Sequence, residues 1–264
     1  MNTGYFLTDA FLYIGRSYDP ESHSHHAAQI CIGLDRPLMV EAAGKTYDAC
    51  SFIFIGANVP HRIRSGDATV ALLYLEKEGR EYEALSARHG ESQGVGQTPR
   101  YAPAHLKKLL AGLRDGEATK PEIDAVIAAV LACFGGAGGQ RLPLDLRITR
   151  VMRHIRAHPA EKFSHQALAA IAALSASRLS HLFKAQVGVS LRRYILWARI
   201  RHAITLAQSG NSLLACAHEA GFSDSAHFTR TFRAMFGMAP SRLFPAGKNL
   251  RLRIVDEGSH LNSR

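Results

Sequence analysis

The sequence has few of the features that mark membrane-spanning or secreted proteins. Its longest uncharged apolar run, residues 125–134, is too short to cross a bilayer. No basic residue precedes the first apolar residues, and Asp9 follows them, so a signal peptide is not expected. Cysteines are scarce and form no CxxC pair, which predicts buried free thiols at Cys31, Cys50, Cys133 and Cys216. We therefore expect a cytoplasmic protein with no membrane partner.

Acidic residues are scarce in one half of the chain. Residues 1–140 carry 13 Lys and Arg against 16 Asp and Glu, whereas residues 141–264 carry 19 against 6. The two halves thus have net charges of −3 and +13, which indicates that the basic half meets a polyanion. The sequence also lacks a nucleophile motif and a Gly-rich phosphate loop, so we expect no enzyme and no cofactor.

Residues 1–80 have the pattern of a β domain. Short segments rich in Ile, Val, Phe and Leu are separated by turn residues, with no helical period between them. The clearest predicted strands are residues 29–34, 38–42, 51–55 and 69–75. Many short strands in succession predict a small antiparallel barrel or sandwich.

Residues 81–140 are predicted to be mainly helical. One helical face carries Leu106, Leu109, Leu110 and Leu113, and Pro121 opens a second apolar helix. These apolar faces need cover, either from the barrel or from a second copy of the chain. We expect a dimerisation segment here, and hence a homodimer. The Gly-rich residues 135–139 form the clearest domain boundary.

Residues 141–245 are predicted to be all helical. The apolar side chains expected to line the first helix are Leu146, Ile148, Val151, Met152 and Ile155. Ser164 and Ser190 are predicted helix caps, and Ser190 opens a long helix. About 18 residues in that helix span roughly 27 Å. With the flanking helices, this length approaches the ~34 Å between successive major grooves on one face of DNA.

The helical region holds the same kind of segment twice, at residues 166–188 and 213–237. Each copy has a short Ala-rich helix, a tight turn and a second helix with an apolar stripe, which is the outline of a helix-turn-helix. The residues predicted to face DNA are Ser177, Arg178, Ser180, His181 and Lys184 in the first copy, and Ser225, Ala226, His227, Thr229, Arg230 and Arg233 in the second. The alternative is an all-α bundle whose amphipathic helices serve packing alone.

Two stretches of this region carry long motifs: residues 217–242 read AHEAGFSDSAHFTRTFRAMFGMAPSR, and residues 177–194 read SRLSHLFKAQVGVSLRRY. They resemble the DNA-binding domain of the AraC/XylS family of bacterial transcription regulators. The resemblance implies seven helices, two helix-turn-helix units and promoter binding. By position it implies base-facing roles for Ser177, Ser180 and His181, and for Ser225, Ala226, His227 and Arg230. One departure is Ala173, which stands where the second copy has the turn residue Gly221.

Histidines cluster in the near-neutral half. The segment His23-Ser-His-His26, followed later by Val59-Pro-His-Arg-Ile63, resembles the cupin-like sensor domain of many AraC/XylS regulators. Two histidines two apart on a strand project to the same side, and His61 can join them, so a metal site stays an alternative. The acidic ligand of metal-binding cupins is missing after His25, where the chain reads Ala27-Ala28-Gln29. We predict an effector pocket formed by His23, His25, His26 and His61, without a metal.

The sequence as a whole predicts an α+β protein. A cupin-like antiparallel β-barrel (residues 1–80) precedes a helical dimerisation segment with a Gly-rich linker (81–140), an all-α AraC-type DNA-binding domain with two helix-turn-helix units (141–245) and a tail (246–264). The predicted function is promoter-specific regulation in response to a small-molecule effector. The expected partners are double-stranded promoter DNA, the effector, RNA polymerase and a second copy, in the cytoplasm at the nucleoid. One alternative is a metal-dependent or small-molecule-binding cupin enzyme with a regulatory DNA-binding appendage, and another is a nonspecific architectural DNA binder.

Overall fold

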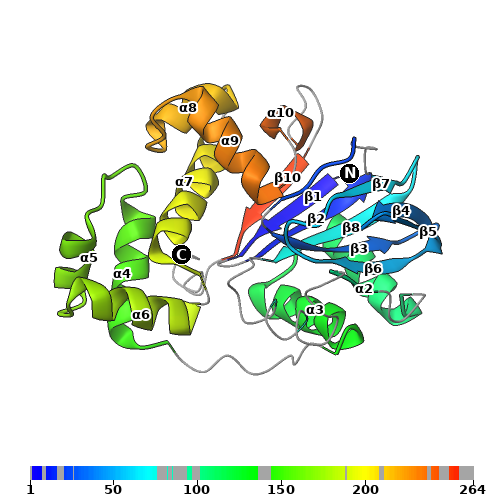
Figure 1. The fold of residues 1–264 in the computed structure, drawn as a ribbon, viewed down its shortest axis with the longest axis horizontal. Coiled ribbons are helices and arrows are strands. Elements are labelled where there is room, and N and C mark those ends of the chain that lie inside the picture. The colour runs from blue at the N-terminus through cyan, green and yellow to red at the C-terminus, as the bar shows by residue number, and fades with distance from the viewer. Residues whose placement is uncertain are drawn as a thin grey trace. The chain divides into compact units, whose positions relative to one another are not determined.

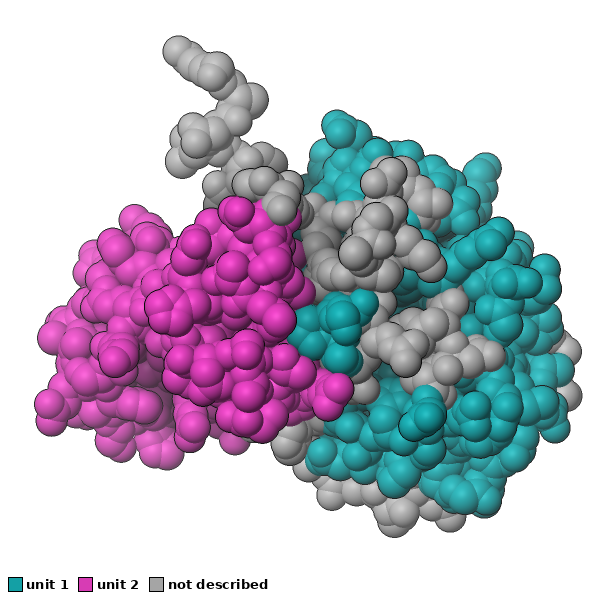
Figure 2. Space-filling model, turned by 90° about the horizontal axis from the view of Figure 1, so that it is seen from above, with its two compact units in different colours: residues 1–139, 235–264 teal, residues 140–234 magenta. Residues whose placement is uncertain are grey.

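The chain folds into two compact units, residues 1–139 with 235–264 and residues 140–234 (Figures 1 and 2). The computed structural model describes residues 2–7, 10–16, 21–25, 27–75, 82, 85, 94–96, 102–135, 144–187, 189–207, 211–236, 239–243 and 250–255. Within these residues, no helix combines the length and the apolar character that crossing a membrane requires. His26, most of the Gly-rich linker and the last nine residues lie outside the described part of the chain.

The first unit contains two β-sheets. The larger sheet has the order β10-β1-β2-β8-β3-β6-β9, and the smaller has the order β5-β4-β7. Their bounds are β1 (Asn2–Phe6), β2 (Ala10–Arg16), β3 (Ala28–Gly33), β4 (Leu38–Ala42), β5 (Lys45–Cys50), β6 (Phe52–Ile55), β7 (His61–Arg64), β8 (Thr69–Leu75), β9 (Val95–Gly96) and β10 (Leu250–Ile254). Among the described strands every pairing is antiparallel except that of β1 with β10. The predicted α+β class and the antiparallel β domain are confirmed.

The strands form where apolar residues can be buried on a sheet. All residues of β3 and of β6 are buried, which explains why β6 is apolar throughout and β3 is apolar apart from Gln29. The four strands predicted most clearly are all present, within a residue or two at their ends. Strand β5 gave no such signal because its central residues are mostly exposed and polar.

Strand β10 brings the C-terminal segment back to the N-terminal sheet. It pairs with β1 in parallel register, from Asn2 opposite Leu250 to Phe6 opposite Ile254. Beyond the strand, the amide of Val255 donates to the carbonyl of Phe6 at 2.8 Å. The sequence prediction had treated this segment only as a tail. Its alternating Leu-Arg-Leu-Arg-Ile pattern is a strand signal that the helical context had hidden.

The returning strand is expected to stabilise the β domain through Val255, which is 6% exposed and packs in the core of the first unit. Val255→Ala should lower the free energy of unfolding of that unit by about 1–2 kcal/mol, because it removes buried methyl groups and leaves a cavity. Urea unfolding of the full chain measures the change. Leu109→Ala is the control, since Leu109 is 46% exposed. Equal stability of the Val255 variant and the wild type would show that the tail contributes nothing.

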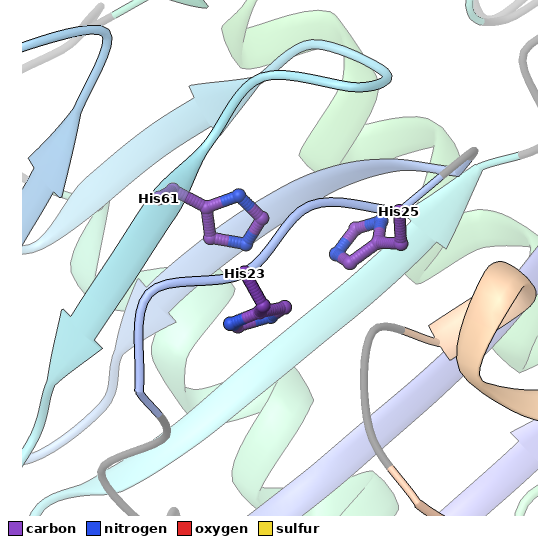
Figure 3. Close-up of side chains that lie close together, drawn as sticks. All are labelled: His23, His25 and His61. Carbon is purple, nitrogen blue, oxygen red and sulfur yellow. The ribbon is translucent and has the colours of Figure 1, made fainter.

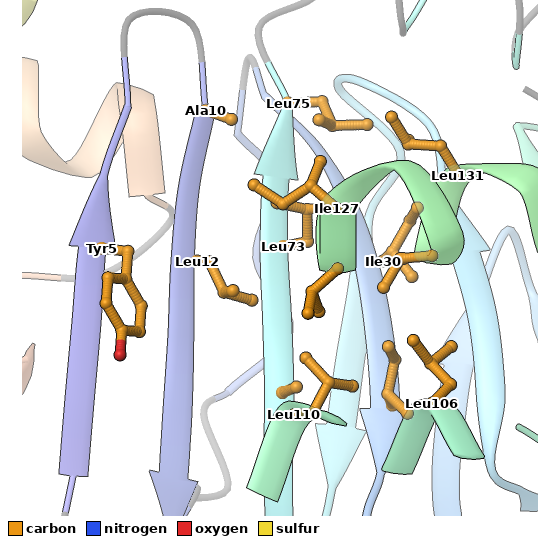
Figure 4. Packing of buried hydrophobic residues seen from close by; sticks show 14 of the residues in the cluster. Tyr5, Ala10, Leu12, Ile30, Leu73, Leu75, Leu106, Leu110, Ile127 and Leu131 are labelled. Atoms are coloured by element: carbon orange, nitrogen blue, oxygen red, sulfur yellow. The ribbon is translucent and has the colours of Figure 1, made fainter. Parts of the chain in front are cut away.

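Two helices, α2 (Ala104–Asp115) and α3 (Lys120–Cys133), cover the larger sheet (Figure 4). Their buried side chains include Leu106, Leu110 and Ile127, which pack against strand residues such as Leu73. Thr119 and Glu122 form a capping box that fixes the start of α3. The barrel therefore supplies the cover that these apolar faces need, and this was one of the two expected ways of covering them.

The second unit is helical, and its core is formed by the apolar faces of its first four helices. The helices from residue 146 onward are α4 (Leu146–Ala157), α5 (His165–Ile171), α6 (Ala176–Val187), α7 (Leu191–Ala207), α8 (Leu213–Glu219), α9 (Ser225–Phe236) and α10 (Pro240–Leu243), of which α10 belongs to residues 235–264 of the first unit. These match the seven helices that the resemblance implies. The prediction that Leu146 faces inward was wrong: it is 73% exposed, because it is the first residue of α4 and lies outside the apolar stripe that begins at Ile148.

Candidate DNA-binding surface and histidine site

The first helix-turn-helix consists of α5, a tight turn and α6. The Ser164 hydroxyl caps α5 by accepting from the Ala167 amide at 3.0 Å, as predicted. Ala173 forms the turn with a φ of +50°, a left-handed conformation that is unusual for a residue with a side chain. The Ser175 hydroxyl then accepts from the Arg178 amide at 3.2 Å and caps α6. Each end of the turn is thus fixed by a local backbone or side-chain interaction.

The second helix-turn-helix consists of α8, its turn and α9. Gly221 forms this turn with a φ of +89°, and a Cβ added there would lie 2.8 Å from the backbone of Ala160. Asp224 caps α9, since its carboxylate accepts from the His227 amide at 2.6 Å. That hydrogen bond, with a second one from Ser223, holds the pKa of Asp224 below its usual range. The two helix-turn-helix segments therefore share a left-handed turn residue and a side-chain cap, although the residues differ.

Helix α7 connects the two helix-turn-helix units. It begins after Ser190, whose hydroxyl accepts from the Arg193 amide at 3.3 Å, as the predicted cap should. Its 17 residues span about 26 Å at 1.5 Å per residue. Trp197, Ile200 and Ile204 are buried and anchor α7 in the unit. This length is close to the one expected for a connection between two reading helices.

Most of the residues predicted to face DNA are exposed on α6 and α9. The exposed residues are Ser177, Arg178, His181, Lys184, Ser225, Ala226, Arg230 and Arg233. Ser180, His227 and Thr229 are half-buried. The Ser180 hydroxyl donates to the Ala176 carbonyl of its own helix at 3.0 Å, and the His227 ring nitrogen Nδ1 lies 3.2 Å from the Ser223 hydroxyl. Ser180 and His227 therefore have part of their hydrogen-bonding capacity already used within the protein.

A basic hollow of about 380 Å³ lies beside these helices within the second unit. Its lining residues come from the α5 region, α7 and α9, and half of them are basic or carry an imidazole: Lys162, Phe163, His165, Leu168, Leu191, Arg192, Ile195, Leu196, Arg199 and His227. The Arg199 guanidinium is held by the carbonyls of Pro159 and Glu161, at 3.1 and 2.9 Å. Lys162 and Arg192 are not among the residues predicted to face DNA, because they lie outside the two duplicated helices.

The structure brings His23, His25 and His61 together at the edge of the β domain (Figure 3). His23 and His61 form an antiparallel bridge with two backbone hydrogen bonds, at 3.0 and 2.9 Å. One ring nitrogen from each of the three histidines lies within 4.8 Å of the others. The expected convergence of these three side chains is thus present.

Each of the three rings is oriented by a backbone carbonyl. The Nδ1 atoms of His23, His25 and His61 lie 2.9, 2.7 and 2.8 Å from carbonyl oxygens two residues away along the chain. His25 and His61 are buried, whereas His23 is half-buried. Burial, together with the neighbouring His25, lowers the pKa of His61 to about 3, so its ring is neutral at physiological pH.

A buried amide completes this site. Gln29, on β3, is 1% exposed, and its Oε1 lies 3.0 Å from His25 Nε2 and 3.1 Å from His61 Nε2. The other end of the amide, Nε2, lies 3.5 Å from the Tyr74 hydroxyl on β8. Gln29 was noted in the sequence only as the replacement of an acidic ligand. Its contact with two histidines depends on the pairing of strands far apart in the chain, which the sequence does not show.

Comparison with known proteins finds a matching helix-turn-helix family, similar regulators and a similar fold. A helix-turn-helix domain family matches residues 168–245. The regulator LumQ of Photobacterium leiognathi, named a probable transcriptional regulator, is 26% identical over 83% of this chain and 90% of its own length. The arabinose operon regulatory protein of Escherichia coli is 34% identical over 40% of this chain, but only 36% of that protein is matched. A structure of ToxT from Vibrio cholerae O395 has the same fold, with a TM-score of 0.52 and 14% identity over 92% of this chain and all of that one.

The two capped helix-turn-helix units, the β domain and these similarities define a DNA-binding transcription regulator. More specifically, residues 168–245 match a helix-turn-helix domain and are similar to the DNA-binding part of AraC-type regulators. The relatives that the chain resembles are named as transcription regulators.

Proposed function

We propose that the chain binds promoter DNA through both helix-turn-helix units and changes its DNA affinity when a small-molecule effector binds its β domain. The observation that carries this proposal is the pair of capped reading helices, α6 and α9, joined by the 17-residue α7 within one basic unit. In this proposal α6 and α9 enter successive major grooves. The exposed residues of the two helices contact bases and phosphates, and Lys162 and Arg192 add phosphate contacts.

Arg230 provides the sharpest test of base reading, because it is exposed on α9 and a guanidinium can bond guanine at two positions. Arg230→Ala should cost roughly 1–3 kcal/mol on the preferred site and relax specificity at one base pair. The measurement is fluorescence anisotropy with the preferred promoter and with single-base variants, in the presence of random competitor DNA.

Two further variants separate base reading from charge. Arg230→Lys keeps the charge and loses the bidentate geometry, so it should retain nonspecific binding but lose discrimination. Arg64→Ala is the matched control, since Arg64 is an exposed arginine of the β domain, paired with Glu41 at 2.8 Å. If Arg230→Ala weakens all DNA sequences equally, Arg230 contacts phosphate alone and the base-reading role is wrong.

The effector is proposed to bind at His23, His25 and His61, the cluster that the structure brings together, with His26 adjoining it in the sequence. The site lies in the near-neutral half of the chain, so its occupancy is expected to alter DNA affinity by coupling rather than by direct contact. Homodimerisation and contact with RNA polymerase are further parts of the proposal. For the dimer, Leu109 is the residue of the predicted segment that stays exposed, since Leu106, Leu110 and Leu113 are buried.

A further inference from the structure

Three side chains that can ligate a metal lie together at the end of α4, in the second unit: His154, His158 and Glu161. They stand at positions i, i+4 and i+7, a spacing that places side chains on one face of a helix. Two histidines four residues apart on a helix have the spacing of helical zinc sites. One ligand atom from each of the three residues lies within 4.8 Å of the other two.

The backbone around this cluster is held in place. His158 follows the last residue of α4, and its amide donates to the His154 carbonyl at 3.1 Å. The Glu161 amide donates to the His158 carbonyl at 3.0 Å, so the next turn continues from the helix end. Arg199, on α7, donates to the carbonyls of Pro159 and Glu161 at 3.1 and 2.9 Å. The loop that carries Glu161 is therefore fixed to α7.

Both histidine rings have neighbours that orient them. The His158 Nδ1 atom lies 3.2 Å from the His154 carbonyl oxygen, which can only accept, so Nδ1 carries the hydrogen. In the neutral ring the lone pair is then on Nε2, and ligating histidines commonly have their tautomer fixed by such a bond. The His154 ring packs edge-on against Phe163, with the ring centroids 5.7 Å apart.

The separation of His154 and Glu161 is the observation that points to an ion. The His154 Nε2 atom lies 3.7 Å from the Glu161 Oε2 atom, which is too long for a hydrogen bond. Two ligand atoms of a tetrahedral ion with bonds of about 2.1 Å are roughly 3.4 Å apart. The pair is thus spaced nearly as two ligands of one ion are. The alternative is an ion pair between a protonated His154 and Glu161.

We propose that His154, His158 and Glu161 form a binding site for one divalent first-row transition-metal ion such as Zn²⁺. Water completes the coordination, because Glu161 and His158 are exposed and His154 is half-buried. Small side-chain rotations bring the three ligand atoms to coordination distance, while the backbone hydrogen bonds stay as they are.

The charges around the cluster select the class of ion. Glu161 brings one negative charge, whereas Arg150 one turn earlier on α4, Lys162 next in the chain and Arg199 on α7 are basic. Attraction by charge alone is therefore weak, and binding has to come from the bonds between imidazole and metal. Imidazole suits zinc, cobalt, nickel and copper, whereas magnesium and calcium take oxygen ligands. We expect Zn²⁺ to bind and excess Mg²⁺ not to compete.

The position of the cluster gives the ion a structural role. It joins the end of α4 to the loop that Arg199 ties to α7, and Ala160 of this loop lies directly against the turn residue Gly221. An ion at the cluster would therefore steady the loop on which the second helix-turn-helix packs. Saturating Zn²⁺ should raise the melting temperature of the helical signal by about 4 °C or more.

Metal binding is tested on the full chain after treatment with a chelator. Zn²⁺ is titrated by calorimetry, Co²⁺ by its visible absorption, and bound ions are counted by mass spectrometry. The count should fall by one ion per chain in His158→Ala and in Glu161→Gln at micromolar metal. The comparison between variants cancels any ion held elsewhere on the chain. His181→Ala is the matched control, an exposed histidine of the same unit that stands in none of the ligand groups of the described residues.

Glu161→His replaces the carboxylate by another ligand and should keep the ion that Glu161→Gln loses. Both changes are made at an exposed position whose bond to Arg199 comes from the backbone, so the test holds even if a histidine variant misfolds. An ion count that is unchanged in Glu161→Gln and His158→Ala would overturn the site and leave the ion pair. An equal loss in His181→Ala would show nonspecific binding and would overturn it as well.

The effect of the ion on DNA binding rests on the proposed function and is tested separately. Promoter affinity of the wild type and of Glu161→Gln is measured with chelator and with added Zn²⁺. A several-fold gain with Zn²⁺ in the wild type alone supports the structural role. Metal binding without such a gain leaves the site standing and overturns that role in DNA binding. Failure to bind any promoter DNA in either condition instead overturns the proposed function.

Discussion

Gly221→Ala is expected to destabilise the second unit by about 2–5 kcal/mol and to abolish specific DNA binding. Two costs add here. An alanine at a φ of +89° pays roughly 1–2 kcal/mol for a left-handed conformation. Its methyl group would also lie 2.8 Å from Ala160 Cα and 2.9 Å from its carbonyl oxygen, and forcing a methyl into a packed place costs about 1–3 kcal/mol.

The clash at Gly221 cannot be relieved by a change of rotamer, because both close atoms belong to the backbone of Ala160. The turn or the loop at Ala160 must shift, and a shift of the turn displaces α8 relative to α9. Urea unfolding followed by circular dichroism measures the stability, and anisotropy with promoter DNA measures the binding. Wild-type stability and affinity in this variant would show that the turn is not constrained as the structure indicates.

Ala173→Gly is the matched control at the equivalent turn of the first helix-turn-helix. Ala173 already has a φ of +50°, so glycine removes strain but gains freedom in the unfolded chain. These effects oppose each other, and we expect a change within about 1 kcal/mol in either direction. An exchange between glycine and alanine is therefore expected to cause a large loss of stability at position 221 and a small change at position 173.

The sequence predicted the parts of the fold that local patterns determine. The caps at Ser164 and Ser190, the duplicated helix pair and strands such as Thr69–Leu75 follow from side-chain period and turn chemistry. The pairing of β10 with β1 joins the two ends of the chain, and no local pattern specifies such a partner. The exposure of Leu146 was missed because periodicity identifies a face of a helix but not where the packed part of that face begins.

The histidine site shows the same limit. The spacing of His23 and His25 predicted that they share a side, and the bridge to His61 brings the third ring to them. The role of Gln29 depends on β3 pairing with β8 and on ring orientations set by backbone carbonyls. A sequence read residue by residue shows a missing carboxylate at this position, whereas the structure shows an amide oxygen directed at two imidazoles.

DNA affinity is expected to fall by about 10³-fold or more between 50 and 200 mM salt, if six or more phosphates are neutralised. The physical reason is release of condensed counterions, and residues 141–264 carry the excess of positive charge that it requires. The measurement is the promoter affinity of the full chain at four or five salt concentrations. The slope of the logarithm of affinity against the logarithm of salt concentration then counts the phosphate contacts.

Single-charge variants locate those contacts on the second unit. Lys184→Gln on α6 and Lys162→Gln in the basic hollow should each reduce the salt slope by about 1, because each removes one phosphate contact. Lys108→Gln removes an exposed lysine of α2 in the first unit and should leave the slope unchanged.

Slopes that respond equally to all three variants would indicate attraction by overall charge alone. A wild-type affinity that is the same at 50 and 200 mM salt would exclude phosphate neutralisation as the source of binding. Reduced slopes confined to Lys184 and Lys162 would instead place the DNA backbone along α6 and the mouth of the hollow, where the two reading helices can meet the major groove.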